Sequence, residues 1–199
     1  YEQSESLVFD DGQLKNASFD TSQGLGLRAI SGETAGYSHS SELSEAALKR
    51  AGQTVKAVQS GRGGIMADGP ARTNRSLYID DNPLNLAPFE AKVKLLSDID
   101  AYARGLDDRV RQVSASISGS WQAVQIIRAD GSRAADIRPL VRLNISCVVG
   151  EGERMESGNY GAGGRETYET YLQPDTWQFA AKEALRQALI NLESVPAPA

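Results

Sequence analysis

The stretch that decides the fold is Val141-Arg142-Leu143-Asn144-Ile145-Ser146-Cys147-Val148-Val149. Its odd-numbered residues are all apolar, whereas Arg142, Asn144 and Ser146 between them are polar. Side chains alternate between the two faces of a β-strand, so this pattern predicts a strand with one buried and one polar face. Such strands are typical of antiparallel sheets, which can leave one face open to water.

The same period-two pattern extends on both sides of this strand, from Val110 to about Arg165. Asp130-Gly131 is a hairpin signal, and Gly119-Ser120 is predicted to form another turn. Turns this short imply antiparallel pairing, because parallel strands need long crossover connections. We therefore expect an antiparallel meander over this part of the chain.

Two helices are predicted to flank the meander. Pro88 suits the first turn of one helix, and Asp175 is expected to be the N-cap of the other. The apolar face of the first would consist of Phe89, Leu96, Ile99, Tyr102, Ala103 and Leu106. The buried face of the second would consist of Trp177, Ala181, Ala184, Leu185, Ala188 and Leu192. Both sets have the spacing of an amphipathic helix.

The first 60 residues predict four strands followed by a helix. Asp10-Asp11-Gly12 contains the Asp-Gly pair that tight hairpins favour, and Ser31-Gly32 is a second turn signal. Alternating side chains indicate the strands, among them Leu7 and Phe9 in the first strand and Ala35, Tyr37 and His39 in the fourth. The helix is expected to begin with Ser41 as N-cap and to bury Ala47, Ala51 and Val55.

These elements predict an α+β fold, with two subdomains of antiparallel sheet and helices packed on one face of each. Residues 1–60 would form an N-terminal ββββα subdomain, and residues 61–87, rich in Gly, Pro, Asn and Asp, a connecting segment. Residues 88–194 would form a middle subdomain of helix, meander and helix. Residues 195–199 are expected to be a linker to a C-terminal domain that the chain lacks.

Composition excludes several classes of function. The net charge is −5, and the 21 Lys and Arg residues are scattered, which argues against nucleic-acid binding. The apolar runs are too short to span a membrane. A single cysteine rules out an internal disulfide framework and suits a reducing compartment, so a cytoplasmic location is expected.

The residues that usually carry catalysis are scarce. His39 is the only histidine, and Cys147 lies on the apolar face of the decisive strand, so we expect no zinc site, no nucleophile–base pair and an inert core thiol. Gly24-Leu25-Gly26-Leu27-Arg28-Ala29 loosely matches a dinucleotide-binding fingerprint, but a strand is predicted after it where that motif needs a helix. We therefore expect no catalytic residue, metal ligand or bound cofactor in this chain.

The segment Gly158-Asn159-Tyr160-Gly161-Ala162-Gly163-Gly164-Arg165 leaves two interpretations open. It can be a bulged or flexible end of a strand. Alternatively, its glycines leave room for another backbone to come close, and Arg165 meets a carboxylate. On the second interpretation, Gly161, Gly163, Gly164 and Arg165 contact a peptide or a partner.

Several stretches of the chain resemble one family, the TldD/PmbA proteins. The resemblance covers nearly the whole chain. The stretch at residues 136–143 is specific enough to favour the TldD branch over its paralogue. The stretches are residues 22–32 with Gly36-Tyr37, Asp136-Ile137-Arg138-Pro139-Leu140-Val141-Arg142-Leu143, Gly161-Ala162-Gly163-Gly164-Arg165, and Ala188-Leu189-Ile190-Asn191-Leu192 with Pro196-Ala197-Pro198.

The resemblance implies a function that composition alone does not indicate. The family consists of cytoplasmic zinc metallopeptidases. Older descriptions call its members modulators of DNA gyrase. A TldD-type subunit carries a His-Glu-x-x-x-His helix and forms a heterodimer with a PmbA/TldE-type subunit. Members of the family process modified peptides and degrade unfolded ones. That motif lies beyond the linker, so no zinc ligand can be assigned here. Zinc is expected in the full-length protein only, and this chain alone is expected to be inactive.

Two functions are therefore considered. In the first, the chain is the non-catalytic N-terminal and middle region of a TldD-like zinc metallopeptidase, where it shapes the substrate chamber and the partner interface. In the second, it is a free-standing peptide- or protein-binding module. The gene sequence beyond Ala199 distinguishes them.

Overall fold

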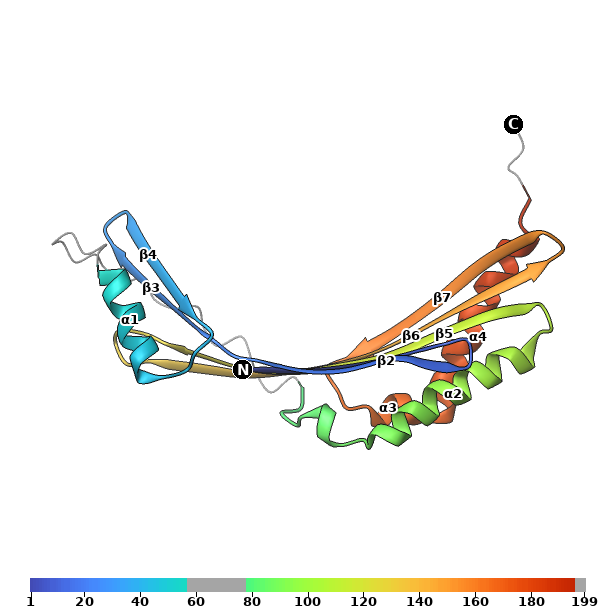
Figure 1. Ribbon diagram of the computed structural model, residues 1–199, viewed down its shortest axis with the longest axis horizontal. Coiled ribbons are helices and arrows are strands. Elements are labelled where there is room, and N and C mark those ends of the chain that lie inside the picture. Colours follow the sequence, from blue (N-terminus) through green and yellow to red (C-terminus); the bar gives the residue numbers. More distant parts are fainter. Residues whose placement is uncertain (57–77, 196–199) are drawn as a thin grey trace. The chain divides into compact units, whose positions relative to one another are not determined.

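The computed structural model describes residues 1–56 and 78–195, which fall into two compact units (Figure 1). The first unit holds Tyr1–Glu2, Val124–Asp136 and the described part of Thr21–Arg75. The second holds Gln3–Asp20 and the described parts of Ser76–Ala123 and Ile137–Ala199. Most of the predicted connecting segment and of the predicted C-terminal linker lies outside the described residues.

A five-stranded sheet runs through the second unit in the order β2-β1-β5-β6-β7. Strands β6 and β7 pair antiparallel, as the alternating pattern predicted. The sheet unites the first two strands of the predicted N-terminal subdomain with the predicted meander. The strands are β1 (Glu2–Asp10), β2 (Gln13–Ser22), β5 (Val110–Ile127), β6 (Arg133–Glu151) and β7 (Arg154–Gly164).

Helices cover one face of this sheet, which confirms the predicted α+β class. They are α2 (Phe89–Leu106), the short α3 (Glu169–Leu172) and α4 (Pro174–Glu193), and they lie on the same side of the strands (Figure 1). Leu143 and Ile145 are each 1 % exposed beneath them, so the predicted buried face of β6 is confirmed. The opposite face carries no described helix. It presents the polar residues that alternate with the core.

A buried ion pair joins α2 to β1. Lys92 of α2 is only 2 % exposed and pairs with Glu5 of β1. Its ammonium group lies 4.7 Å from the centroid of the Tyr168 ring, and the Tyr168 hydroxyl donates a hydrogen bond to Glu5. Burial raises the pKa of Tyr168 well above its ordinary value. The charge of Lys92 is thus compensated by a carboxylate and by an aromatic face, as a buried cation requires.

The first unit contains a two-stranded hairpin and one helix. Strands β3 (Leu25–Ser31) and β4 (Thr34–Ser40) pair antiparallel, and α1 (Glu45–Lys56) packs against them through Ala47, Ala51 and Val55. These strands and the buried stripe of the helix agree with prediction. On the face away from the buried Gly36, Ile30 is 63 % and Tyr37 is 65 % exposed.

Three predicted boundaries are wrong. Gly119-Ser120 is not a turn, because β5 continues through it. A Cβ atom on Gly119 would lie 2.3 Å from the Tyr168 hydroxyl, so this glycine permits a close approach instead of a bend. Ser44, not Ser41, caps α1 by accepting the Ala47 N–H at 3.1 Å. Pro174 is already the first residue of α4, so Asp175 lies inside its first turn.

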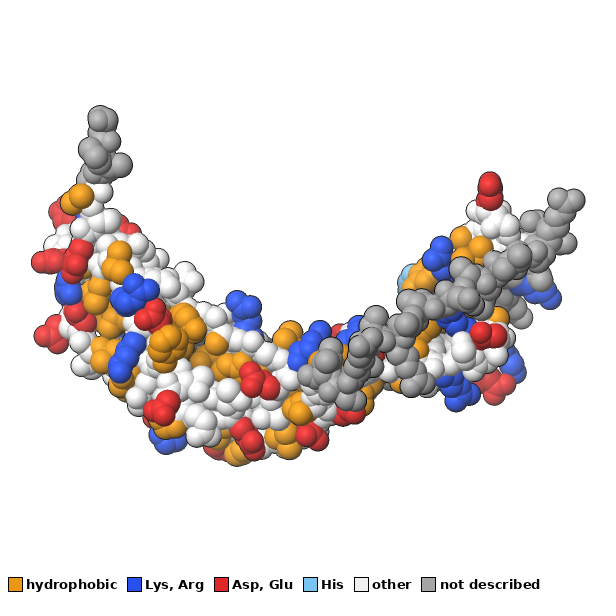
Figure 2. All heavy atoms as spheres, turned by 180° about the vertical axis from the view of Figure 1, so that it is seen from behind, with side chains coloured by type: hydrophobic (Ala, Val, Ile, Leu, Met, Phe, Trp, Pro, Cys, Tyr) orange, Lys and Arg blue, Asp and Glu red, His pale blue; other side chains and the backbone are white. Residues whose placement is uncertain are grey.

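Two predicted core positions of α2 are also wrong. Phe89 is 45 % and Leu106 is 41 % exposed, and they are the first and last residues of the helix. The central positions Leu96, Ile99 and Ala103 are fully buried as predicted. Hydrophobic side chains, orange in Figure 2, are interspersed with charged ones over the surface of the second unit. None of the described helices is long and apolar enough to cross a membrane.

Candidate functional site

The glycine-rich end of β7 presents its residues alternately to the two faces of the sheet. In the register with β6, Arg142 is opposite Gly163 and Asn144 is opposite Gly161, so these four residues share the open face. Ala162 is opposite the buried Leu143 and packs against the core. The alanine that interrupts the glycine run therefore lies on the helix face, and the open face of the run keeps its glycines.

The open-face glycines are needed because two β6 side chains lie across them. A Cβ atom on Gly161 would be 2.9 Å from Asn144 Oδ1 and 3.1 Å from Arg142 Nη2. A Cβ atom on Gly163 would be 2.7 Å from the carbonyl oxygen of Val141. The absence of side chains on β7 thus lets the Arg142 guanidinium extend sideways over the neighbouring strand.

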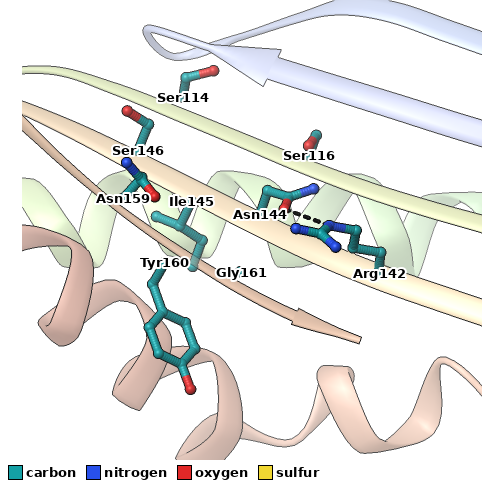
Figure 3. Close-up of a pocket in the computed structure, with 9 residues that line it drawn as sticks. All are labelled: Ser114, Ser116, Arg142, Asn144, Ile145, Ser146, Asn159, Tyr160 and Gly161. Atoms are coloured by element: carbon teal, nitrogen blue, oxygen red, sulfur yellow. Dashed lines mark hydrogen bonds between the residues drawn. The ribbon is translucent and has the colours of Figure 1, made fainter. Parts of the chain in front are cut away.

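A shallow polar pocket of about 160 Å³ surrounds these side chains on the open face (Figure 3). In Figure 3, the side chains of Ile145 and Tyr160 point away from the pocket, towards the helices. The other side chains that line the pocket are polar. No carboxylate lines it. The lining residues are Ser114 and Ser116 of β5, Arg142, Asn144, Ile145 and Ser146 of β6, and Asn159, Tyr160 and Gly161 of β7.

Arg142 is the one charged residue of the pocket lining, and a neutral neighbour holds it in place. Its Nε donates a hydrogen bond to Asn144 Oδ1 at 2.8 Å (Figure 3). Within the described part of the chain, Arg142 makes no ion pair. Its two terminal nitrogens therefore keep their hydrogen-bond donors available in a fixed orientation.

The other predicted site residues lie outside the pocket lining. The Arg165 guanidinium is stacked over the ring of Tyr78, with its carbon 4.9 Å from the ring centroid. Gly164 is on the helix face, where a Cβ atom would be 2.6 Å from Glu166 Oε1. The structure thus brings only Gly161 of the predicted set into the pocket and places Gly163 beside it.

Sequence reasoning missed Arg142 and its hydroxyl neighbours as site residues. A signal was present in β5, where Ser114, Ser116, Ser118 and Ser120 occupy four alternate positions. A solvated strand face usually carries longer polar side chains, whereas serines keep the surface low. Low side chains on β5 and the missing side chains of Gly161 and Gly163 on β7 leave Arg142 and Asn144 accessible from above.

The helix face of β7 is shaped by a different glycine. Gly158 is buried against α4, where a Cβ atom would lie 2.3 Å from both the Ala184 carbonyl oxygen and the Ala188 nitrogen. Two small residues one turn apart on α4 thus allow the helix backbone to rest on the strand. This contact fixes the orientation of β7 and of the pocket on its other face.

Cys147 and His39 are not among the residues that line this pocket. Among the described residues, no three His, Cys, Asp or Glu side chains lie close enough together to hold a metal ion. Cys147 is a core thiol, as predicted, and burial raises its pKa to about 11. His39 is exposed on β4, with its ring 6.0 Å from that of Tyr37. These residues do not fit a zinc site.

Comparison with known proteins assigns the fold to a family. The model of the PmbA/TldA metallopeptidase domain 1 matches residues 1–58, and that of the central domain matches residues 82–192. The chain belongs to the TldD/PmbA family. These two matches cover most of both predicted subdomains.

Curated relatives of the family are similar over almost the whole chain. A metalloprotease TldD homolog from Haemophilus influenzae is 39 % identical over 99 % of the chain, and one from Buchnera aphidicola is 34 % identical over 98 %. The chain spans 42 % of the length of each of these relatives.

Solved structures show the same fold at low sequence identity. A protein from Bacteroides thetaiotaomicron described as a candidate modulator of DNA gyrase superposes with a TM-score of 0.76 at 14 % identity, over 98 % of this chain and 45 % of that one. TldE from Thermococcus kodakarensis superposes with a TM-score of 0.69 at 13 % identity, over 98 % and 44 %.

Proposed function

We propose that this chain is the non-catalytic N-terminal and middle region of a TldD-like zinc metallopeptidase, and that it shapes the substrate chamber and the partner interface. The family membership and the metalloprotease relatives support the parent activity. The part of the chain that the structure describes offers no metal site, so the zinc of the full-length protein would be held elsewhere. Unfolded or modified peptides would be the substrates, in the cytoplasm.

The observation that carries a substrate-binding role is the position of β7 as the last strand of the sheet. The Asn191 side chain donates a hydrogen bond to the Ser157 carbonyl oxygen, which therefore points away from β6. Alternate residues of an antiparallel strand point their main-chain groups to the same side. We infer that Asn159, Gly161 and Gly163 also direct their N–H and C=O groups outwards.

An extended peptide can pair with these outward groups as an added strand. Strand addition draws its affinity from main-chain hydrogen bonds, which suits an enzyme that accepts many unfolded sequences. Phe179 of α4 is 55 % exposed and makes an edge-to-face contact with Tyr160, 5.6 Å between ring centroids. This ring beside the glycine segment offers an apolar contact for a peptide side chain. Of the two contacts expected for Gly161, Gly163, Gly164 and Arg165, the contact with a peptide is therefore the one that we propose.

The partner interface would lie on a different surface. The open face of the β3–β4 hairpin exposes Ile30 and Tyr37, whereas the hairpin also packs against α1. A PmbA/TldE-type subunit that covers these side chains would complete the hairpin. A free-standing peptide-binding module is the alternative function, and it uses the β7 edge in the same way without a catalytic domain.

Asn159 allows a test of strand addition that adds no bulk to the strand. In the full-length protein, Asn159→Pro removes one outward N–H donor, whereas Asn159→Ala keeps it. Proline is tolerated on an edge strand whose N–H faces solvent. We expect Asn159→Pro to retain bound zinc and to lose turnover of long unfolded peptides. Asn159→Ala should retain both the zinc and the turnover. Equal turnover in both variants, with the zinc and the heterodimer intact, would refute strand addition at β7.

A further inference from the structure

We propose that Arg142 recognises a carboxylate of the peptide that lies along β7. This inference rests on the proposed peptide-binding function and adds a chemical specificity to it. The carboxylate is either the C-terminal group of the peptide or the side chain of an Asp or Glu residue. Both sources have the planar, two-oxygen geometry that a guanidinium group binds through paired hydrogen bonds.

The position of Arg142 is the first argument. It belongs to β6, yet its Nη2 lies over Gly161 of β7, close enough that a Cβ atom there would be 3.1 Å away. The side chain therefore leans over the last strand, towards the sheet edge. A strand added beside β7 would lie about 4.8 Å beyond it. A carboxylate on the open face of that added strand is within reach of the terminal nitrogens of Arg142.

The surroundings of Arg142 favour an anion. The Asn144 amide oxygen accepts a hydrogen bond from Arg142 Nε, and this bond fixes the plane of the guanidinium group. The hydroxyl groups of Ser114, Ser116 and Ser146 line the same pocket and can donate further hydrogen bonds. No acidic side chain is among the lining residues, so the positive charge has no counter-ion within the pocket itself.

Other arginines of the chain show what a purely structural arginine does here. Five of them form ion pairs with carboxylates of the chain, as exposed arginines commonly do. Arg142 instead bonds to a neutral amide and lies on a glycine platform that any larger residue would obstruct. The paired arginines are Arg50, Arg104, Arg109, Arg154 and Arg186.

Arginine side-chain NMR provides the test, because each Nε–H group gives its own signal. Three peptides are titrated into the chain: acetyl-Ala-Ala-Ala with a free C-terminus, the same peptide as its C-terminal amide, and acetyl-Ala-Glu-Ala as its amide. Inorganic phosphate is the fourth probe. We expect saturable shifts of the Arg142 signal with the free acid, the Glu peptide or both, and none with the peptide that lacks a carboxylate. The two carboxylate peptides distinguish the two sources.

Variants separate recognition from mere charge. Arg142→Gln and Gly161→Ala should each weaken carboxylate binding about tenfold or more, the first by removing the charged guanidinium group and the second by displacing it. Arg186→Gln on α4 removes an equal charge from the opposite side of the sheet and should leave binding unchanged. Equal binding of all three peptides, tighter binding of phosphate, or no saturable shift would overturn the proposal. The two proposals can fail separately. If carboxylate peptides bind at Arg142 but Asn159→Pro retains full peptide turnover, strand addition at β7 is refuted and the carboxylate site is supported.

Discussion

The contact between Gly158 and α4 makes a sharp prediction about stability. In Gly158→Ala, the new Cβ atom would lie 2.3 Å from two backbone atoms of α4 and 2.8 Å from the Gln187 Cβ atom. Ordinary non-bonded contacts begin at about 3.5 Å, so the helix must withdraw by on the order of 1 Å. Backbone atoms cannot rotate aside as a side chain can. Overpacking of a core costs about 1–3 kcal/mol, and we expect this change to lie at or above the upper end.

A second glycine provides the matched control with the opposite sign. Gly105 lies near the end of α2, and a Cβ atom there would have no neighbour within 4 Å. Gly105→Ala should therefore stabilise the chain by about 0.5–1 kcal/mol through helix propensity alone. The same chemical change, one methyl group, is thus expected to destabilise at one site and to stabilise at the other.

Urea unfolding followed by circular dichroism measures both changes. The free energy of unfolding comes from linear extrapolation, and unchanged slopes show that the two variants expose the same surface as the parent chain. A cost below about 0.5 kcal/mol for Gly158→Ala would show that α4 does not rest on β7 as described. A loss in Gly105→Ala as large as that in Gly158→Ala would show that added methyl groups are harmful everywhere, and the contact argument would fail.

Two further predictions concern the core and the pH dependence of stability. Ile145→Ala should cost about 2–5 kcal/mol because the side chain is 1 % exposed, whereas Asn144→Ala on the open face should cost far less, and thermal unfolding compares them. Hydrogen bonds from the Arg109 side chain and backbone lower the pKa of Asp107 from 3.8 to about 2. A lowered pKa stabilises the fold above 3.8 and loses that contribution as the pH falls towards 2, so Asp107→Asn should unfold with a weaker pH dependence in this window.

The strands and the main buried faces were predictable from sequence because their signals are local. The alternation from Val141 to Val149 and the helical spacing of the α4 core each require only a face to be buried. The glycines were harder to interpret. The sequence predicts a turn at Gly119, yet this glycine makes room for the side chain of Tyr168, which lies 49 positions away in the chain. A close approach of this kind depends on tertiary contacts that no local pattern contains.

The candidate site was only half predictable for the same reason. The glycine run of β7 was visible, and Gly161 does line the pocket. The sequence predicts Arg142 only as an outward polar residue of its strand, because the alternating pattern does not fix which residues of the next strand lie opposite it. Once the register places Gly161 and Gly163 opposite Asn144 and Arg142, the missing side chains on one strand explain the reach of the arginine on the other.

Hydrogen exchange at β7 tests the central claim, peptide binding by strand addition, most directly. The amide protons of Asn159, Gly161 and Gly163 point outwards in this account, whereas those of Tyr160 and Ala162 point towards β6. When a saturating unfolded peptide is added to the full-length protein, inactivated by removal of its zinc, exchange at the three outward amides should slow, with little change at the two inward ones. Alternating protection of this kind would support an added strand. Unchanged exchange at all five amides, with the peptide bound, would contradict it.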